Sequence, residues 1–577
     1  MSKVIEYLKS YLTLLLFAIA LLVVQAMCDL KLPDFMSDIV NYGVMNGSTI
    51  YIWQTGGKML LITLLGAASS ITMGYCAATI AAGVSHDLRI DVFRKVQGFS
   101  NAEIDNFGTA SLITRTTNDL TQIQMMLVMA VRMIIYAPIL GTGGIINAVS
   151  RSTSMTWIIA LSVITLIGFI MIIFSIVYPR FRSVQKLVDR LNLVTKENLQ
   201  GMLVIRAFNT QKFEEERFDA ANRNLTETNL FLNRTMALAM PFVMLVMNLT
   251  TVIVIWIGSN QVSALKIQIG DMLAFMQYAL QIIMAFLMLS IMFILIPRAA
   301  VSAERIKEVL ETKNSITDPE TPQIYSANFI PVVEFKNVSF RYPGGDDNVL
   351  ENITFTANRG ETTAIIGATG SGKSTLVNLL IRFYDISGGE ILIDGVDIRN
   401  VRLKDLRQKI SYIPQKSLLF SGTIASNLRY ADKNAGEDML EKAARISQSA
   451  EFITTKPEKY DSLIAQGGAN VSGGQKQRLS IARAIVKDAP IYIFDDSFSA
   501  LDLKTDAALR MAIKNELMDT TLFIVAQRIS TIKDAEQIIV LENGRIAGIG
   551  RHRELLENCA VYREIATSQL SEEELLK

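Results

Sequence analysis

Hydrophobic residues along the chain are gathered in its first half, in six long stretches that contain few charges. An α-helix needs roughly 20 such residues to cross a bilayer. An even number of crossings places both ends of the chain on the same side of the membrane. The pattern therefore predicts an all-α, six-helix transmembrane domain over residues 1–311. The six stretches are 11–32, 59–83, 125–149, 155–178, 236–259 and 270–297.

Positive charge is distributed unevenly between these stretches. Two long connections, 84–124 and 179–235, are rich in arginine and lysine. The other connections hold only Lys58, Arg151 and Lys266. Because cytoplasmic segments carry the excess of positive residues, we expect the long connections and both termini in the cytoplasm of a multi-pass cell-membrane protein. The basic residues of the two connections include Arg89, Arg94, Lys95, Arg115, Arg180, Arg182, Lys186, Arg190, Arg206 and Arg217.

The two long connections mix charged and apolar residues at helical spacing, for example in Leu187–Leu193 and Phe213–Phe218. We expect helices that continue past the membrane and turn at tips near Phe99–Phe107 and Arg206–Phe213. The tips are either surface hairpins or contacts to a cytoplasmic motor domain, and the pattern alone does not decide between them.

The composition changes near residue 312. Residues 312–331 are rich in threonine, asparagine, serine and proline, which predicts an exposed linker. From 332 to 577, strand-like runs alternate with helical ones, which predicts an α/β domain. The strand-like runs are Val332–Phe335, Thr363–Ile366, Glu390–Ile393, Ile491–Phe494, Thr521–Val525 and Gln537–Leu541.

A glycine-rich turn in the predicted α/β domain has phosphate-binding chemistry. Residues 367–374 read Gly-Ala-Thr-Gly-Ser-Gly-Lys-Ser and lie between a strand-like run and a helix that begins at Lys373. Backbone N–H groups of such a turn wrap phosphates, and the helix N-terminus adds partial positive charge. Lys373 is predicted to reach the terminal phosphates and Ser374 to ligate Mg²⁺. The sequence therefore predicts a P-loop nucleotide site.

A second glycine turn, Ser472-Gly473-Gly474-Gln475, comes before a helical run. Backbone donors there form either another anion cradle or a simple helix cap. Together with the P-loop and Asp495, at the end of a strand-like run, it resembles the ATP-binding cassette (ABC) family. The resemblance is detailed over residues 332–577. With six spans before that domain, the whole chain resembles a half-size bacterial ABC exporter.

The resemblance implies ATP and Mg²⁺ as cofactors and a second nucleotide-binding domain as partner. Mg²⁺ is expected at Ser374, Gln415 and Asp495. In exporters of this type each P-loop faces the other chain's glycine turn, so Ser472–Gln475 is expected to complete the partner's ATP site. The residues that the resemblance assigns to ATP are Tyr342, Gly367, Thr369, Gly370, Ser371, Gly372, Lys373, Ser374, Thr375 and Gln415.

Three positions depart from the family pattern. Asp496 stands where a glutamate is usual, which withdraws the carboxylate by roughly 1 Å, and such a misplacement can cost about 10²-fold in rate. Gln527 replaces a histidine; it still hydrogen-bonds but lacks the imidazole's proton chemistry. Gln466 replaces a frequent glutamate. The two histidines of the chain, His86 and His552, lie elsewhere.

A weak catalytic pair, Asp496 and Gln527, beside a complete P-loop predicts a degenerate ATP site in one half of a heterodimer. The partner is expected to be a homologous half-transporter with the usual glutamate and histidine. One alternative is a homodimeric exporter in which Asp496 is a slow base. Another is a nucleotide-gated regulator or channel subunit that transports nothing.

The cargo is predicted to be an amphipathic small molecule, a drug or a lipid, taken up in contact with membrane lipid. Asp29 and Arg132 are polar positions inside apolar spans, where charged residues are costly and mark functional sites. They line a cavity or gate, or else lie near span ends and reach the interface. The net charge of +1 gives no basic field for nucleic acid.

Overall fold

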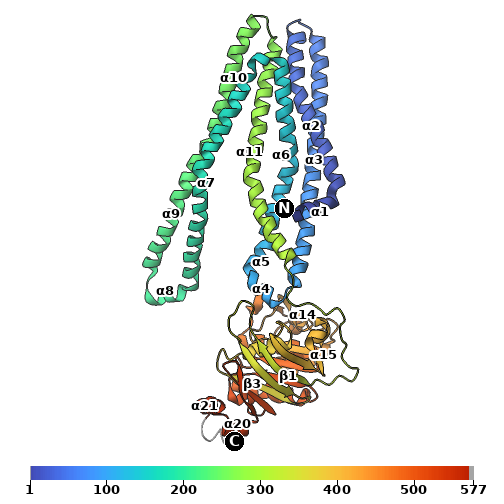
Figure 1. Ribbon diagram of the computed structural model, residues 1–577, viewed down its shortest axis with the longest axis vertical. Helices are drawn as coiled ribbons and strands as arrows, with labels where there is room; N and C mark the ends of the chain where they lie inside the picture. Colours follow the sequence, from blue (N-terminus) through green and yellow to red (C-terminus); the bar gives the residue numbers. More distant parts are fainter. Residues whose placement is uncertain (1, 571–577) are drawn as a thin grey trace. The chain divides into compact units, whose positions relative to one another are not determined.

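The computed structural model describes residues 2–570 (Figure 1). Residue 1 and residues 571–577, which the sequence analysis assigned to the transmembrane and nucleotide-binding domains, lie outside the described residues. The chain divides into two compact units. One comprises Met1–Gln97 and Ala110–Thr312, and the other comprises Gly98–Thr109 and Lys313–Lys577.

The first unit consists of helices. Within the described residues, six helical segments are long and apolar enough to cross a membrane, in agreement with the predicted six-helix domain. They are Lys3–Val44, Thr49–Gln97, Thr109–Arg151, Thr153–Val177, Gln211–Ser263 and Ile269–Glu311. The helices are α1 (Ser2–Leu8), α2 (Leu12–Asp38), α3 (Thr49–Gln97), α5 (Thr109–Thr116), α6 (Asn118–Arg151), α7 (Thr156–Gln200), α8 (Met202–Phe208), α9 (Gln211–Ala237), α10 (Ala239–Ser263) and α11 (Ile269–Glu311).

Helices α6 and α11 have the most extensive contact in this unit, and both helices also contact α2. Small residues allow the close approach. A Cβ atom at Gly144 of α6 would lie 2.9 Å from Cγ1 of Ile282, and one at Gly141 would lie 3.5 Å from Cβ of Ala285. Membrane helices associate through such small residues because lipid offers no hydrophobic drive to bring them together.

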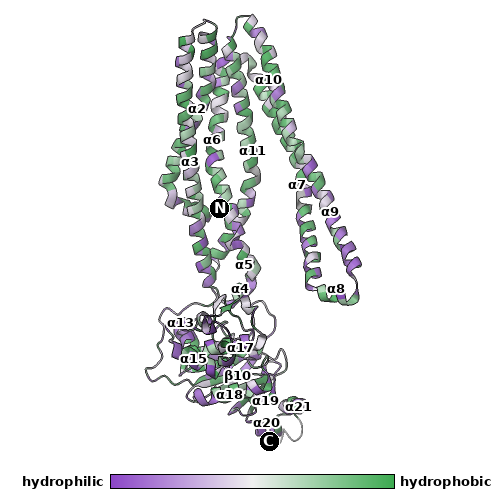
Figure 2. Ribbon diagram, turned by 180° about the vertical axis from the view of Figure 1, so that it is seen from behind, coloured by the Kyte–Doolittle hydropathy of each residue, from purple (hydrophilic) through white to green (hydrophobic). Residues whose placement is uncertain are grey.

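Short helices occupy both predicted cytoplasmic tips. Helix α4 (Asn101–Phe107) lies at the first tip and belongs to the second unit. Helix α8 lies at the second tip, where α7 and α9 run side by side. Along the chain, the residues change from largely hydrophilic in α9 to largely hydrophobic in α10 (Figure 2). The prediction that the helices extend well beyond their apolar spans is confirmed, because α3 has 49 residues and α7 has 45.

The second unit is an α/β domain. Its main sheet has the strand order β12-β11-β3-β10-β9-β6, and a second sheet has the order β2-β1-β4-β5. The strands are β1 (Val333–Phe340), β2 (Leu350–Ala357), β3 (Thr362–Gly367), β4 (Gly388–Ile393), β5 (Val396–Asp397), β6 (Ile410–Ile413), β7 (Gly422–Thr423), β8 (Leu463–Ile464), β9 (Ile491–Asp495), β10 (Thr521–Val525), β11 (Gln537–Glu542) and β12 (Arg545–Gly550). The helices are α12 (Lys373–Leu380), α13 (Leu403–Gln408), α14 (Ile424–Leu428), α15 (Glu437–Ile446), α16 (Ala450–Thr454), α17 (Gly473–Val486), α18 (Leu503–Glu516), α19 (Ile529–Ile532), α20 (His552–Asn558) and α21 (Ala560–Gln569).

The predicted strand-like runs became β1, β3, β4, β9, β10 and β11. Every residue of β9 and β10 is buried, as expected for parallel strands that are covered on both faces. β3, β10, β9 and β6 are parallel neighbours, so their carboxyl ends meet at one edge of the main sheet. This edge is where open α/β sheets bind ligands.

Most residues of the predicted linker 312–331 are exposed or half-buried, but it also contains buried apolar side chains. Ile316 is 6 % exposed and Tyr325 is 9 % exposed. Tyr325 packs edge-on against Phe329, at 5.2 Å between ring centroids, and joins the core of the second sheet. Polar residues dominate the average composition of the segment. For this reason the average did not reveal that Ile316 and Tyr325 are buried.

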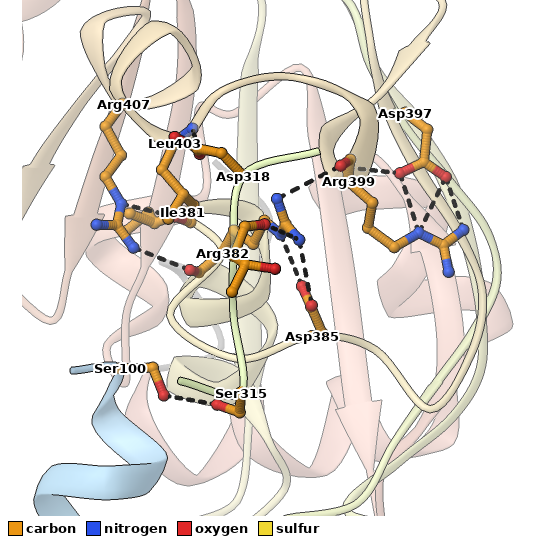
Figure 3. Close-up of polar contacts among 11 residues, drawn as sticks. Ser100, Ser315, Asp318, Ile381, Arg382, Asp385, Asp397, Arg399, Leu403 and Arg407 are labelled. Atoms are coloured by element: carbon orange, nitrogen blue, oxygen red, sulfur yellow. Dashed lines mark hydrogen bonds and ion pairs between the residues drawn. The ribbon is translucent and has the colours of Figure 1, made fainter. Parts of the chain in front are cut away.

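Polar contacts also fix the start of this segment (Figure 3). Asp318 accepts a hydrogen bond from the backbone N–H of Leu403 at 2.8 Å. The hydroxyls of Ser100, just before α4, and Ser315 lie 2.8 Å apart. Nearby, the buried Arg382 forms an ion pair with Asp385 at 2.7 Å. The segment is therefore an integral part of the second unit.

Helix α4 is joined to this segment by Glu103, which is buried. Its Oε2 accepts hydrogen bonds from the backbone N–H and the hydroxyl of Ser100, at 2.8 and 2.6 Å, as a helix cap. Its Oε1 accepts a bond of 3.0 Å from the backbone N–H of Ser315. Asp105 of α4 accepts a bond of 2.8 Å from the hydroxyl of Tyr384. The first tip is thus anchored on the α/β domain of its own chain.

Candidate nucleotide site

The P-loop connects β3 to α12 at the carboxyl edge of the main sheet. Two of its positions require glycine, because a side chain would collide with neighbouring atoms and, at one of them, because the backbone is left-handed. A Cβ at Gly367 would lie 2.1 Å from the carbonyl oxygen of Leu541. Gly372 has a φ of 95°, and a Cβ there would lie 2.6 Å from Cδ2 of Leu350. Thr369 and Gly370, at the turn of the loop, are exposed.

Lys373 begins α12 and is 8 % exposed. Its Nζ donates to the carbonyl oxygens of Gly367 and Ala368, at 2.9 and 2.7 Å. Burial lowers the pKa of this ammonium, and the carboxylates of Asp496 and Asp495 partly offset the effect. The lysine side chain therefore folds back onto the loop. Its charge lies in the concave side of the loop, here called the bowl.

Asp495 ends β9 and is 3 % exposed. Its Oδ1 accepts a hydrogen bond of 2.9 Å from the hydroxyl of Ser374, and its Oδ2 accepts one of 3.3 Å from the hydroxyl of Tyr412. Burial raises the pKa of Asp495 above the ordinary range, although both hydrogen bonds act in the opposite direction. A hydroxyl and a carboxylate in contact form an oxygen donor pair of the kind that Mg²⁺ prefers.

Two of the three departures from the family pattern, Asp496 and Gln527, lie in contact. Asp496 follows β9 with a left-handed φ of 47°. Its Oδ2 accepts hydrogen bonds from Nε2 of Gln527 at 3.0 Å and from Nε2 of Gln415 at 3.3 Å. Burial raises the pKa of Asp496 as well. Each of the three residues follows a different parallel strand, β9, β10 or β6, so the sheet edge itself brings them together.

Tyr342 lies next to α12. Its hydroxyl is 3.0 Å from the hydroxyl of Thr375. The ring packs edge-on against Phe340 and Tyr384, at 4.8 and 5.1 Å between centroids, and it remains partly exposed. An aromatic held in this way offers a flat, apolar surface beside the P-loop helix.

The second glycine turn caps α17. Gln475 donates its backbone N–H to Oγ of Ser472 at 3.3 Å, and Ser472 donates its backbone N–H to Oε1 of Gln475 at 3.0 Å. Ser472 and Gly473 are exposed, and a Cβ at Gly473 would meet open space. In the described chain, these residues form no hydrogen bond with the P-loop or with Asp495 and Asp496. Gln466, in the loop before them, is exposed too.

Two residues at the site were missed from the sequence. Tyr412 contacts Asp495, as described above. Gln477 on α17 is 3 % exposed, donates to the carbonyl of Asp496 at 3.4 Å and accepts from the backbone N–H of Ala500 at 3.2 Å. It therefore connects the helix of the second glycine turn to the catalytic strand end. The sequence signal for this role was a polar glutamine at a helix position where an apolar residue is expected.

The residues present fit ATP and Mg²⁺. Ser371 is 4 % exposed, and its Oγ has no hydrogen-bond partner among residues 2–570. Buried polar atoms normally have partners, so this hydroxyl is suited to a ligand oxygen. Gly367 and Gly372 keep the bowl free of side chains, and Lys373 supplies a positive charge.

Comparisons with known proteins agree with this geometry. The family model described as the ABC transporter transmembrane region matches residues 15–286, and the model described as ABC transporter matches residues 350–499. An uncharacterised ABC transporter ATP-binding protein of Mycobacterium tuberculosis is 39% identical, over 98% of this chain and 97% of the relative. An ATP-dependent lipid A-core flippase of Pseudomonas aeruginosa is 31% identical, over 89% of this chain and 85% of that protein.

Among solved structures, a bacterial Atm1-family ABC exporter with ATP bound matches with a TM-score of 0.78, 25% identity and 98% coverage of both chains. A membrane region followed by an ABC-type ATPase domain defines a class of multi-pass membrane transporters. The chain belongs to the ABC transporter family, as a half-size exporter with a cytoplasmic ATPase domain.

Proposed function

We propose that this chain is one half of a heterodimeric exporter in a bacterial cell membrane. It would hold ATP at a degenerate site and move amphipathic drugs or lipids. The observation that carries the proposal is the contact of Asp496 with Gln527, two of the three positions at which the sequence departs from its family. The partner would be a homologous half-transporter with glutamate and histidine at these positions.

In this proposal the P-loop residues and Thr375 bind the phosphates of ATP, and the Tyr342 ring stacks on the adenine. Ser374, Gln415 and Asp495 hold Mg²⁺, which when bound neutralises phosphate charge. The contact between Ser374 and Asp495 and the unpartnered hydroxyl of Ser371 support these assignments. None of these positions departs from the family pattern, so we expect tight binding.

Hydrolysis is expected to be slow at this site. The carboxylate of Asp496 is shorter than that of glutamate, and two amide groups occupy one of its oxygens. A base needs a free lone pair within hydrogen-bond reach of the attacking water. The amide of Gln527 does not titrate near neutral pH and so cannot act as a general acid or base, whereas an imidazole can. These two effects act in the same direction.

The exposed turn Ser472–Gln475 would complete the partner's hydrolytic site. Its backbone donors begin a 14-residue helix, whose N-terminus favours the negative charge of a phosphate. Among the described residues, the side chains of Ser472 and Gln475 form hydrogen bonds only with each other's backbone N–H groups. The chain would therefore bind one ATP and help its partner to hydrolyse the other.

The cargo assignment rests on the relatives of the chain. The similarity to an ATP-dependent lipid A-core flippase supports an amphiphile as cargo. Transport of labelled amphiphiles into sealed vesicles tests this part. A reconstituted pair that hydrolyses ATP but moves no amphiphile would favour the regulator or channel subunit.

The ATPase rate of the purified full-length chain tests the degenerate site, with and without the partner. We expect slow turnover alone. In the pair, Asp496→Asn should change turnover by no more than about twofold, because this carboxylate contributes little. The corresponding change in the partner, glutamate to glutamine, should lower turnover by about 10²-fold or more. Equal losses from both changes would mean that the pair has two working sites and no degenerate one. Rapid turnover of the chain alone would favour the homodimer with Asp496 as base.

A further inference from the structure

Polar side chains within the helical unit form two groups on α2, α6 and α11. In the first group Arg151 forms ion pairs with Asp34 at 2.7 Å and with Asp271 at 2.8 Å. The hydroxyl of Tyr278 donates to Asp34 at 2.8 Å. Each charge in this group has a partner of opposite sign. The first group therefore fastens three helices together and leaves no charge for a ligand.

The second group is centred on Asp29 of α2. The hydroxyl of Tyr136, on α6, donates to Oδ2 of Asp29 at 2.6 Å. Nε2 of Gln281, on α11, donates to the backbone carbonyl of Asp29 at 3.0 Å. Gln25 lies one helical turn before Asp29 and therefore on the same face of α2. The four residues of this group are partly exposed, although single atoms of the group are buried.

Hydrogen-bond acceptors remain unused in this second group. Oε1 of Gln25 and Oε1 of Gln281 are buried and have no partner among the described residues. Within residues 2–570, Asp29 has no ion-pair partner, and its Oδ1 accepts no hydrogen bond. Such acceptors are rare in folded proteins and especially costly in a membrane, where water does not serve them. They are expected to accept hydrogen bonds from a bound molecule.

An apolar surface lies close to these acceptors on α6. Met125, Val128 and Met129 line a shallow hollow that also includes Thr121 and Gln124. Val128 is eight residues from Tyr136, which corresponds to about 12 Å along a helix. That distance suits an alkyl chain of moderate length. Methionine side chains adapt to apolar ligands of different shapes.

We propose that Asp29, Tyr136, Gln25 and Gln281 form a head-group site for an amphiphile with a primary ammonium group. The ammonium has three N–H donors, which match the carboxylate and the two amide oxygens. The alkyl chain extends along the surface of α6 formed by Val128 and Met129. This inference rests on the proposed export of amphipathic molecules and names the chemical class of cargo.

Arg132 is the other charged residue near this group, one helical turn before Tyr136 and exposed. It forms no ion pair with Asp29 in the described chain. An anionic amphiphile would place its head group at Arg132 and leave the three acceptors without donors. A primary ammonium satisfies all three, and for this reason the acceptors favour a cation.

Equilibrium binding of radiolabelled dodecylamine to the full-length chain in lipid nanodiscs tests the site. Any subunit that copurifies is retained, and uptake by empty nanodiscs is subtracted. The comparison ligands are dodecyltrimethylammonium, which keeps the charge but has no N–H donor, and dodecyl sulfate. We expect dodecylamine to bind about tenfold more tightly than the quaternary amine. Equal affinity, or a preference for dodecyl sulfate, would overturn the proposal.

The variant Asp29→Asn should weaken dodecylamine binding by about tenfold or more. Asp38→Asn, a carboxylate at the end of the same helix, is the matched control and should leave the affinity unchanged. Gln281→Leu removes one acceptor at similar volume and provides a second test if Asp29→Asn is poorly folded. Wild-type affinity in well-folded Asp29→Asn, or in Gln281→Leu, would assign the binding to another site.

The proposed function can fail separately. Wild-type protein that binds dodecylamine as expected but transports no amphiphile in sealed vesicles would contradict export and leave the site intact. Conversely, ATP-dependent transport of amphiphiles that is unchanged in Asp29→Asn, together with unchanged dodecylamine binding, would reject the site and retain export.

Discussion

The P-loop and the residues that follow β9 and β10 occupy the same edge of one sheet, yet they differ in how they are held. In the P-loop, Ser371, Gly372 and Lys373 are buried, and two glycines are enforced by close backbone contacts. Beyond β10, Gln527 is exposed, and its side-chain amide donates a single hydrogen bond to Asp496. The P-loop is the binding half of the site and is held by buried residues. Asp496 and Gln527 are its finishing half, which depends on more exposed side chains.

This difference indicates where the site tolerates change. A substitution at Gly367 of the P-loop must displace backbone atoms, because a Cβ there would lie 2.1 Å from a carbonyl oxygen. A change at Gln527 meets solvent and costs little in stability, since surface substitutions usually have small effects. The residues that finish hydrolysis can therefore diverge while nucleotide binding is preserved. That is the arrangement expected of a site that keeps ATP and hydrolyses it slowly.

The largest effect is expected from Lys373→Ala. It removes a charged donor from a buried bowl, and charge-assisted hydrogen bonds are worth about 1.5–3 kcal/mol. We expect ATP affinity to fall by about 100-fold, measured by equilibrium binding to the full-length chain. Lys433→Ala, in an exposed loop, is the control and should bind ATP normally. A loss below about threefold would mean that the lysine is not part of the binding half.

A smaller effect, opposite in sign, is expected when the finishing half is completed. The double variant Asp496→Glu with Gln527→His restores both family residues, and the ATPase rate of the chain alone should rise by about tenfold. ATP affinity should not change, because the P-loop is untouched. If the rate stays at the wild-type level, the slow turnover has another cause, such as an incomplete second site.

Much of this site could be predicted because its signals are local. Gly367 and Gly372 of the loop have close contacts that leave no room for a side chain, and the buried runs of β9 and β10 are continuous in sequence. The substitutions Asp496 and Gln527 were identifiable one residue at a time. Their mutual contact was not, because it depends on the order of parallel strands.

What the sequence did not predict depends on contacts between distant segments. Gln477 is separated from Asp496 by 19 residues, and only the packing of α17 beside β9 brings its amide to that backbone. Ile316 and Tyr325 lie in a polar segment whose average composition predicts exposure. Two apolar side chains suffice to anchor a segment when a core with matching space lies beside it, and a window average does not report single positions.

The smallest effect concerns Asp495 and pH, and it distinguishes the metal side of the binding half from the phosphate side. Burial raises the pKa of Asp495, so the folded, ligand-free domain binds this proton more readily than the unfolded chain. The burial penalty on the carboxylate therefore disappears as the pH falls through the raised pKa, and only the ionised form attracts Mg²⁺. Lowering the pH towards this raised pKa should reduce ATP affinity about threefold more with Mg²⁺ than without it. In Asp495→Asn the excess should vanish; if it persists, protonation elsewhere, including on the nucleotide, controls the metal.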